Sequence, residues 1–390
     1  MRARVRAPIL RTVAWATKPL SKRGASPLPT APLRILLIRP DHLGDVLFAT
    51  PAIRSLRSSL PDAHIACIVG PWAIEIVQHN QCLDAVATCP FPGFTRRPKR
   101  HLLEPYSVLW SHARALRAQF FDVALILRFD HWWGAMLAHW AGIPRRIGYA
   151  LPPVSPFLTE SLPYTSDRHE VEQNMRMIEA IVGGELPHPG PLEFNPQPDD
   201  VRTAARLLAG AEADGGYLCV HPGAGAPVKL WRHEAFAQVA DTIARQYGLR
   251  VVITGTAGER HLTQSIAERM KTDPLLIVGE TNLGELAAVM ARCRLVIGVD
   301  SGPLHLAVSQ GVPTVHLFGP VDHRAFGPWG DSNKHLVVVA NTDCIPCNRL
   351  DYGPDELADH PCVRSISVDQ VLEAADSLLR NDSHAGRGMV

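Results

Sequence analysis

Short apolar runs alternate along the chain with longer stretches whose apolar residues recur at every third or fourth position. The runs suit strands buried on both faces of a parallel sheet, and the longer spacing is typical of helices that bury one face. The predicted strands cover residues 34–39, 63–69, 85–88, 122–127, 217–220, 250–254, 275–278, 295–299 and 312–318. Strands that alternate with helices predict an α/β protein built on doubly wound parallel sheets.

A proline-rich segment divides this pattern into two halves. Residues 187–198 contain five prolines, which indicates a linker. We therefore expect a Rossmann-like domain at 34–190, a linker with a bridging helix at 191–213, and a second Rossmann-like domain at 214–380. Two such domains that face each other place a ligand cleft at their junction.

The stretch from Arg294 to Pro320 has the clearest order of elements. A buried strand ends at Asp300, Ser301 and Gly302, and a short helix pattern containing His305 leads to the next strand. Ligands of open α/β sheets bind at this carboxyl edge, and the free N–H groups at a helix start attract phosphates. We predict a phosphate-binding tip here. The alternative is that these residues only cap and pack the helix.

A second glycine-containing loop follows the strand at 217–220. Gly223-Ala224-Gly225 lacks the third glycine of a dinucleotide fingerprint, so Lys229 in the same loop is better explained as a phosphate contact. Lys229 could also be a surface residue stacked on Trp231. Glu259 heads the helix after the next strand, where a carboxylate either accepts from a ribose hydroxyl or complements the helix dipole.

Asp45 is the carboxylate best placed to act as a base. It lies between the strand at 34–39 and the helix that follows. We expect it to face the cleft from the domain opposite to Lys229. A group that removes a proton from an incoming hydroxyl should lie across from the group that holds the leaving group. Asp45 could instead cap the helix, and the pattern does not separate it from its rival Asp41.

Bulk composition narrows the class of protein. The chain has 390 residues and a formal net charge of +1, which is long enough for two cores and gives no case for nucleic-acid binding. No apolar run reaches the length of a membrane-spanning helix. The eight cysteines are scattered, which favours a reduced cytoplasmic protein. We expect a monomer.

The amino terminus differs from the rest. Residues 1–33 hold seven basic side chains and no acidic one. Such a segment resembles a transit peptide or a basic tail that lies on anionic lipid, and we expect a disordered, solvated arm.

Three cysteines near the end of the second domain raise the question of a metal. Cys344, Cys347 and Cys362 supply three thiols, but the fourth ligand would have to be His335 or His360 and the spacing matches no known zinc finger. We expect no metal, with this trio as the alternative.

The motifs together resemble glycosyltransferase family 9, the lipopolysaccharide heptosyltransferases. RILLIRPDHLGDVLFATPAIRSLRSSLPDAHI is similar to the amino-terminal signature, although Pro40-Asp41-His42 departs from the commonest loop and the arm before residue 34 is extra. HPGAGAPVKLW, ITGTAGE and the stretch GETNLGELAAVMARCRLVIGVDSGPLHLAVSQGVPTVHLFGP are similar to the carboxyl-terminal signatures, in the same order.

The resemblance implies a GT-B fold and inverting transfer from a nucleotide-sugar donor, usually ADP-heptose, without a cofactor or metal. It makes Asp45 the base and Glu259 the ribose contact. The adenine lies near Thr281 and Leu283, and the donor sugar near Asp300. It also implies that the diphosphate is bound by Lys229, Ser301, Gly302 and His305.

The implied acceptor is an anionic glycolipid, which suggests an enzyme at the cytoplasmic face of the inner membrane. Basic residues of the first domain are candidates to bind it, namely Arg96, Arg97, Lys99, Arg100 and Arg128, or else they form a solvated face. Two other functions stay open: a nucleotide-sugar epimerase of similar fold, and a sugar or nucleotide binder without catalysis.

Overall fold

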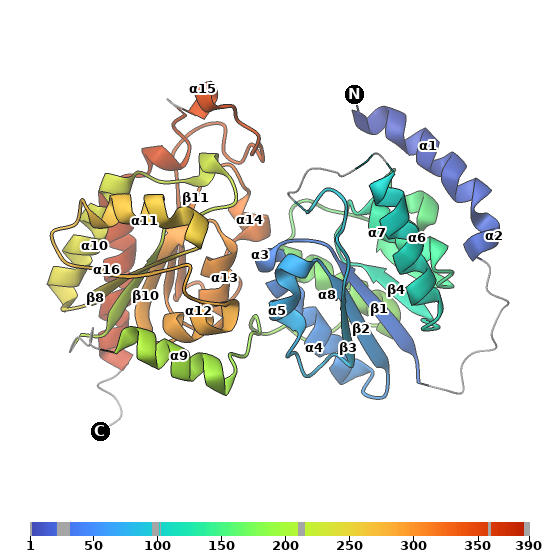
Figure 1. Cartoon of the computed structure of the whole chain (residues 1–390), viewed down its shortest axis with the longest axis horizontal. Helices are drawn as coiled ribbons and strands as arrows, with labels where there is room; N and C mark the ends of the chain where they lie inside the picture. Colours follow the sequence, from blue (N-terminus) through green and yellow to red (C-terminus); the bar gives the residue numbers. More distant parts are fainter. Residues whose placement is uncertain are drawn as a thin grey trace. The chain divides into compact units, whose positions relative to one another are not determined.

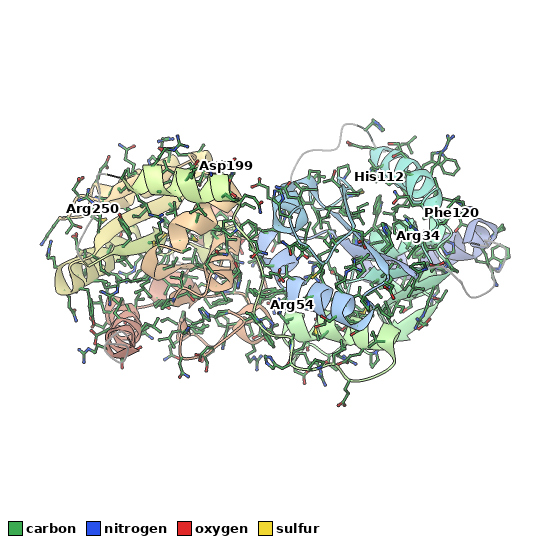
Figure 2. All side chains as sticks on the ribbon, turned by 90° about the horizontal axis from the view of Figure 1, so that it is seen from below. Arg34, Arg54, His112, Phe120, Asp199 and Arg250 are labelled. Carbon is green, nitrogen blue, oxygen red and sulfur yellow. The ribbon has the colours of Figure 1, made fainter. Side chains whose placement is uncertain are left out.

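The computed structural model describes residues 2–21, 32–95, 101, 103–209, 215–357 and 360–385. The chain divides into two compact units, Met1–Pro189 and Gly190–Val390, and each is built on its own sheet (Figure 1). At the end of the first unit, Arg54 donates to the carbonyl oxygen of Pro189 at 2.7 Å (Figure 2).

The first unit contains a six-stranded parallel sheet with the order β3-β2-β1-β4-β5-β6. Its strands are β1 (Arg34–Arg39), β2 (His64–Val69), β3 (Ala85–Thr88), β4 (Val123–Ile126), β5 (Arg145–Tyr149) and β6 (Glu160–Leu162). The central strand β1 pairs with β2 on one side and with β4 on the other, and its residues from Ile35 onward are buried. The first four strands confirm the predicted ones, while β5 and β6 come in addition.

Helices cover both faces of this sheet (Figure 1). Apolar residues of α6 (Glu104–Arg117) and α7 (Trp132–Trp140) share one core with Leu36, Ile38 and Ile126. On the opposite face α4 (Thr50–Ser59) packs against α8 (Glu170–Val182). Two short helices, α3 (Leu43–Leu47) and α5 (Ile74–Val77), follow β1 and β2.

The expectation of a disordered arm is wrong for residues 2–21. They form α1 (Arg2–Ala16) and α2 (Lys18–Ser21). Leu10 and Ala14, four positions apart on one helix face, are buried in the same core as α6 and α7. Thr17 also makes a 3.1 Å hydrogen bond with His139 of α7. An apolar face of two residues among so many basic ones does not predict an amphipathic helix. In the structure, these two residues nevertheless pack the helix against the first unit.

The second unit repeats the architecture with the strand order β12-β11-β10-β7-β8-β9. Its strands are β7 (Tyr217–His221), β8 (Arg250–Gly255), β9 (Leu275–Val278), β10 (Cys293–Val299), β11 (Thr314–Phe318) and β12 (His335–Val339). All of the pairs are parallel, so the α/β prediction of two doubly wound sheets is confirmed. β12 was not predicted.

Helices again form the outer layers of the second unit. α10 (His233–Tyr247), α11 (Arg260–Ala267) and α16 (Val368–Ala385) contribute to the core on one face. α9 (Pro198–Leu208) and α12 (Leu283–Met290) cover β8 and β9 on the other face. α13 (Gly302–Ser309) connects β10 to β11, and the short helices α14 (His323–Phe326) and α15 (Pro354–Leu357) follow β11 and β12.

Candidate functional site

Each sheet has one topological switch point, and several of the candidate residues lie in the loops that leave the strands there. In the first sheet the chain runs outward in opposite directions from β1 and β4, and in the second from β7 and β10. Loops that leave neighbouring strands in opposite directions open a crevice at the carboxyl edge, which is where ligands of such sheets bind. The topology thus gives each unit one place for a site.

In the first unit, Asp45 lies in the first turn of α3, directly after β1. The residue at the cap position of this helix is His42, so the alternative that Asp45 is the helix cap does not hold. The Asp45 side chain is 29% exposed, and the guanidinium of Arg39 lies 3.9 Å from its carboxylate. Asp45 is therefore half-buried, reachable from solvent and only loosely paired.

Arg39, the last residue of β1, is the centre of a buried charge cluster. Its guanidinium lies 2.9 Å from Asp41 and 3.0 Å from Glu170, and it donates to Asn174 at 3.2 Å. Asn174 in turn donates at 3.1 Å to the carbonyl oxygen of Phe48, the residue that follows α3. The first turns of α8 thereby fix the guanidinium next to the loop that carries Asp45.

The two rival carboxylates of this loop have opposite electrostatics. Burial and the neighbouring Asp41 carboxylate raise the pKa of Asp45 to about 7. Burial also opposes the ionisation of Asp41, but Arg39 and Arg128 outweigh it and lower its pKa. A base that works near neutral pH needs a pKa near 7, so this geometry favours Asp45 over Asp41.

Arg128 does not stand free for an acceptor. It forms ion pairs with Asp41 and with Asp130, and its guanidinium lies 5.3 Å from the ring centre of Phe94 and 5.5 Å from that of Phe129. Its charge is thus compensated by two carboxylates, and two aromatic rings lie close to it. The other predicted acceptor contacts, Arg96, Arg97, Lys99 and Arg100, lie outside the described residues.

In the second unit, the loops after β7 and β10 bring Lys229 and Asp300 together. The Lys229 ammonium lies 2.6 Å from the Asp300 carboxylate, with only 15% and 9% of the two side chains exposed. These residues are far apart in sequence and meet because β7 and β10 are neighbours. The alternative of a surface lysine stacked on Trp231 therefore does not hold.

The helix start next to Asp300 is arranged to receive a polar ligand. Ser301 occupies the cap position of α13, but its side chain makes no capping hydrogen bond. Its hydroxyl is buried and has no hydrogen-bond partner among the described residues. Gly302 begins the helix and His305 is buried one turn further on. A hydroxyl and helix-start N–H groups are donors of the kind that bind anions, so the phosphate site stays a prediction.

Glu259 lies against the glycine loop as well as at a helix start. Its carboxylate accepts from the backbone N–H of Thr256 at 2.7 Å and from the hydroxyl of the same residue at 2.9 Å. A Cβ atom placed on Gly223 would come within 1.9 Å of the other carboxylate oxygen. Glu259 therefore caps the helix start and borders the loop that leads to Lys229, and its contact with a ribose stays a prediction.

Thr281 and Leu283 lie between the end of β9 and the start of α12, at the same carboxyl edge of the sheet. Both are half-buried, and the helix begins with a capping box, in which Asn282 accepts from the N–H of Glu285 at 2.7 Å. The box fixes the backbone on which the two side chains stand.

The remaining candidates concern a metal site and a surface groove. In the part of the chain that is described, no group of three or more His, Cys, Asp or Glu side chains is arranged to hold a metal. Cys344 and Cys347 are exposed, whereas Cys362 is buried.

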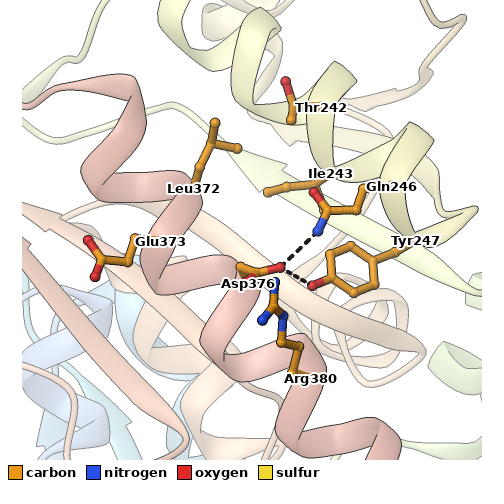
Figure 3. A pocket seen from close by; sticks show the side chains of 8 residues that line it. All are labelled: Thr242, Ile243, Gln246, Tyr247, Leu372, Glu373, Asp376 and Arg380. Atoms are coloured by element: carbon orange, nitrogen blue, oxygen red, sulfur yellow. Dashed lines mark hydrogen bonds and ion pairs between the residues drawn. The ribbon is translucent and has the colours of Figure 1, made fainter.

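A surface groove between α10 and α16 contains a polar cluster in which Gln246 donates to Asp376 at 2.8 Å (Figure 3). Asp376 also accepts from the hydroxyl of Tyr247 and pairs with Arg380, and the groove contains no predicted residue.

Sequence reasoning missed Arg39, Glu170 and Asn174. Arg39 ends an apolar run, and a basic side chain there requires acidic partners once the strand is buried. That signal was present in the sequence. Glu170 and Asn174 are partners from a helix that the pattern did not reveal, so neither could be named in advance.

Comparison with known proteins identifies the relatives of this chain. Residues 109–351 match the model of glycosyltransferase family 9 (heptosyltransferase). Lipopolysaccharide heptosyltransferase 3 of Escherichia coli K12 is 27% identical over 348 residues, which cover 87% of this chain and 96% of that protein. A family 9 glycosyl transferase from Veillonella parvula DSM 2008 superposes with a TM-score of 0.74 at 26% identity, covering 90% of this chain and 98% of that one. The E. coli heptosyltransferase WaaC, solved with ADP, shares the fold at a TM-score of 0.66 and 19% identity, over 89% of this chain and all of its own.

Proposed function

Because the chain belongs to glycosyltransferase family 9 and is a glycosyltransferase of GT-B fold, we propose that it moves a heptose from ADP-heptose to a hydroxyl of a lipopolysaccharide core acceptor. The observation that carries the proposal is the division of labour between the two switch points. The first holds a half-buried carboxylate with a pKa of about 7, and the second holds a lysine and a helix start suited to a diphosphate.

The second unit binds the donor in this proposal. The Lys229 ammonium, the Ser301 hydroxyl and the first N–H groups of α13 surround the diphosphate, and His305 supports them from within the helix. Glu259 accepts from the ribose, Thr281 and Leu283 flank the adenine, and Asp300 orients Lys229 beside the sugar. Fixed positive groups stabilise the diphosphate as it leaves, so no divalent cation is required.

The first unit provides the base. Asp45 accepts the proton of the acceptor hydroxyl while the hydroxyl oxygen bonds to the anomeric carbon and the bond from that carbon to the diphosphate breaks. A single displacement of this kind inverts the anomeric configuration. The proposal requires the two switch points to face each other across the cleft expected for a GT-B enzyme, so that base and leaving group lie on opposite sides of the sugar.

The proposed acceptor is an anionic glycolipid, and the proposed place of work is the cytoplasmic face of the inner membrane. Support for the acceptor comes from the relatives named lipopolysaccharide heptosyltransferases. None of the helices among the described residues combines the length and apolar character that crossing a bilayer demands.

The deciding experiment measures ADP release from ADP-heptose with and without a core-oligosaccharide acceptor, in the parent protein and in Asp45→Asn. We expect release only with acceptor, a product of inverted configuration, and loss of turnover with retained ADP binding in the variant. Acceptor-independent conversion of the sugar would point to an epimerase. ADP binding without any turnover would point to a binding protein.

A further inference from the structure

Exposed apolar side chains concentrate on one region of the first unit. Large apolar residues that are exposed number nine among the described side chains, and six of them lie on α1, on α6 or directly beside α6. The six are Ile9, Trp15, Leu103, Tyr106, Trp110 and Phe120. Single exposed apolar residues need no explanation, but a cluster that contains four aromatic rings does.

The exposed residues of α6 form a stripe on the face turned away from the core. Leu109, Ala113 and Leu116 are buried on the inner face. The outer face of a helix on a soluble protein is normally polar. Here Tyr106 and Trp110 are 57% and 58% exposed on it, one turn apart.

Helix α1 also exposes apolar residues. Its inner residues Leu10 and Ala14 are buried, whereas Ile9 and Trp15 are 58% and 78% exposed. Both helices lie next to the end of α7, because Thr17, directly after α1, bonds to His139, and the ring of Trp110 lies 6.3 Å from that of the next residue, Trp140. The exposed apolar residues of α1 and α6 therefore belong to helices that pack on the same neighbour.

Basic residues accompany the aromatic ones. Arg6, Arg11 and Lys18 of the two amino-terminal helices and Arg114 of α6 are exposed, and the first 33 residues contain no acid. Tryptophan and tyrosine settle at the interface of a bilayer, and basic side chains next to them are attracted to anionic headgroups. The chemistry of both groups fits one occupant, an anionic phospholipid surface.

We propose that α1 and the outer face of α6 form a docking surface for an anionic bilayer, with Trp15 and Trp110 inserted at the headgroup level and Arg11 and Arg114 against the phosphates. The surface gives a physical basis to the membrane location proposed above. It does not depend on the transfer reaction, so the two proposals fail separately.

The test is co-sedimentation of the full chain with vesicles in the absence of sugar substrates. Vesicles of phosphatidylcholine with phosphatidylglycerol are compared with vesicles of phosphatidylcholine alone. We expect binding to the anionic vesicles, and a partition coefficient about ten-fold lower in Trp15→Ala/Trp110→Ala. Arg11→Gln/Arg114→Gln should lower it about 25-fold, roughly five-fold per charge. Matched controls on the second unit are Val201→Ala and Arg292→Gln, which replace an exposed apolar and an exposed basic residue.

Three outcomes would overturn the proposal. The first is equal binding of the parent and the tryptophan variant to anionic vesicles, and the second is equal binding of the parent to both kinds of vesicle. The third is a dimer of the parent that does not bind vesicles and that Trp15→Ala/Trp110→Ala converts to a monomer, because the stripe would then be a contact between two copies. All of the replaced side chains are exposed, so an unchanged melting temperature confirms that the variants fold.

Discussion

The guanidinium of Arg39 lies 3.9 Å from the carboxylate of Asp45, farther than it lies from Asp41 or Glu170, which it contacts at 2.9 and 3.0 Å. One positive charge is thus shared among three carboxylates, and Asp45 receives the smallest part. An Asp45 held by a close ion pair would be a weak base, because a close positive charge lowers the pKa of a carboxyl. The geometry instead leaves it able to take up a proton near neutral pH.

The pH profile of transfer should report on Asp45. The base must be deprotonated, so we expect kcat/KM to fall as the pH decreases through about 7, the value to which burial raises its pKa. Asp45→Asn should lower kcat by about 10²–10⁴-fold, the usual contribution of a general base. Initial rates measured between pH 5 and pH 9 check both points. If Asp41→Asn abolishes turnover while Asp45→Asn retains it, Asp41 is the base.

The same residue should cost stability at high pH. The pKa of Asp45 is raised above the ordinary value of an aspartate, so the folded state binds its proton more tightly than the unfolded state. Its contribution is therefore most favourable below pH 4 and is lost as the pH rises to about 7. We expect Asp45→Asn to raise the free energy of unfolding by about 1–2 kcal/mol at pH 8 and to leave it unchanged at pH 4. Urea unfolding at the two pH values measures the difference.

Glu170 should tune the base without touching the substrate. Its carboxylate raises the pKa of Asp45 and also occupies Arg39. Glu170→Gln removes the negative charge and releases Arg39, and both changes lower that pKa. We expect the acid limb of the pH profile to move below 7 in this variant. Glu160→Gln is the matched control, because Glu160 pairs with Arg145 on β5. A loss of activity without any shift of the limb would reduce Glu170 to a structural role.

Lys229 and Asp300 should separate stability from donor binding. Lys229→Met leaves the Asp300 carboxylate nearly buried without its partner, and we expect a loss of about 2–3 kcal/mol in the free energy of unfolding. The double variant Lys229→Met/Asp300→Asn should recover most of that loss. Calorimetric titration with ADP should still show at least ten-fold weaker binding in the double variant. Recovery of both quantities would mean that the pair only stabilises the fold.

Transfer should continue after chelation. Lys229 and the start of α13 supply the positive potential that a divalent cation would otherwise give, so we expect EDTA to leave the rate of ADP release unchanged. Loss of turnover that magnesium restores would contradict this. Loss accompanied by unfolding and restored only by zinc would assign a structural metal to Cys344, Cys347 and Cys362.

The sequence predicted the centre of each sheet better than its edge. β1 and β10 are nearly continuous apolar runs. Such a run is the pattern expected of a strand that is buried on both faces. β5 (RRIGY) and β6 (ESL) contain charged or polar residues, because strands near the edge are partly covered by side-chain hydrogen bonds. Arg145, for example, pairs with Glu160 across them. Helix α8 was missed because its inward face contains polar residues such as Glu170 and Asn174 that bond within the first unit.

Candidate residues that lie in one loop after a strand were predictable from the sequence. The contacts that decide between rival residues were not, because they join segments that are distant in the chain. Ser301 and Gly302 follow β10 directly and Lys229 lies in the loop after β7, and topology then brings these loops to one edge. The choice between Asp41 and Asp45 depends on Arg128, which approaches from the neighbouring strand β4. No local pattern reports such a contact, because the two segments are far apart in the chain.

Helix α1 has a consequence for how the protein is handled. It covers apolar side chains of α7 and of the turn at Ser155–Phe157, and burying Leu10 alone is worth about 1.5–3 kcal/mol. A shortened chain that begins at the first strand would leave this surface bare. Poor solubility of such a truncated protein would then reflect a missing piece of the core, and we expect α1 to resist proteases while it is packed on the first unit.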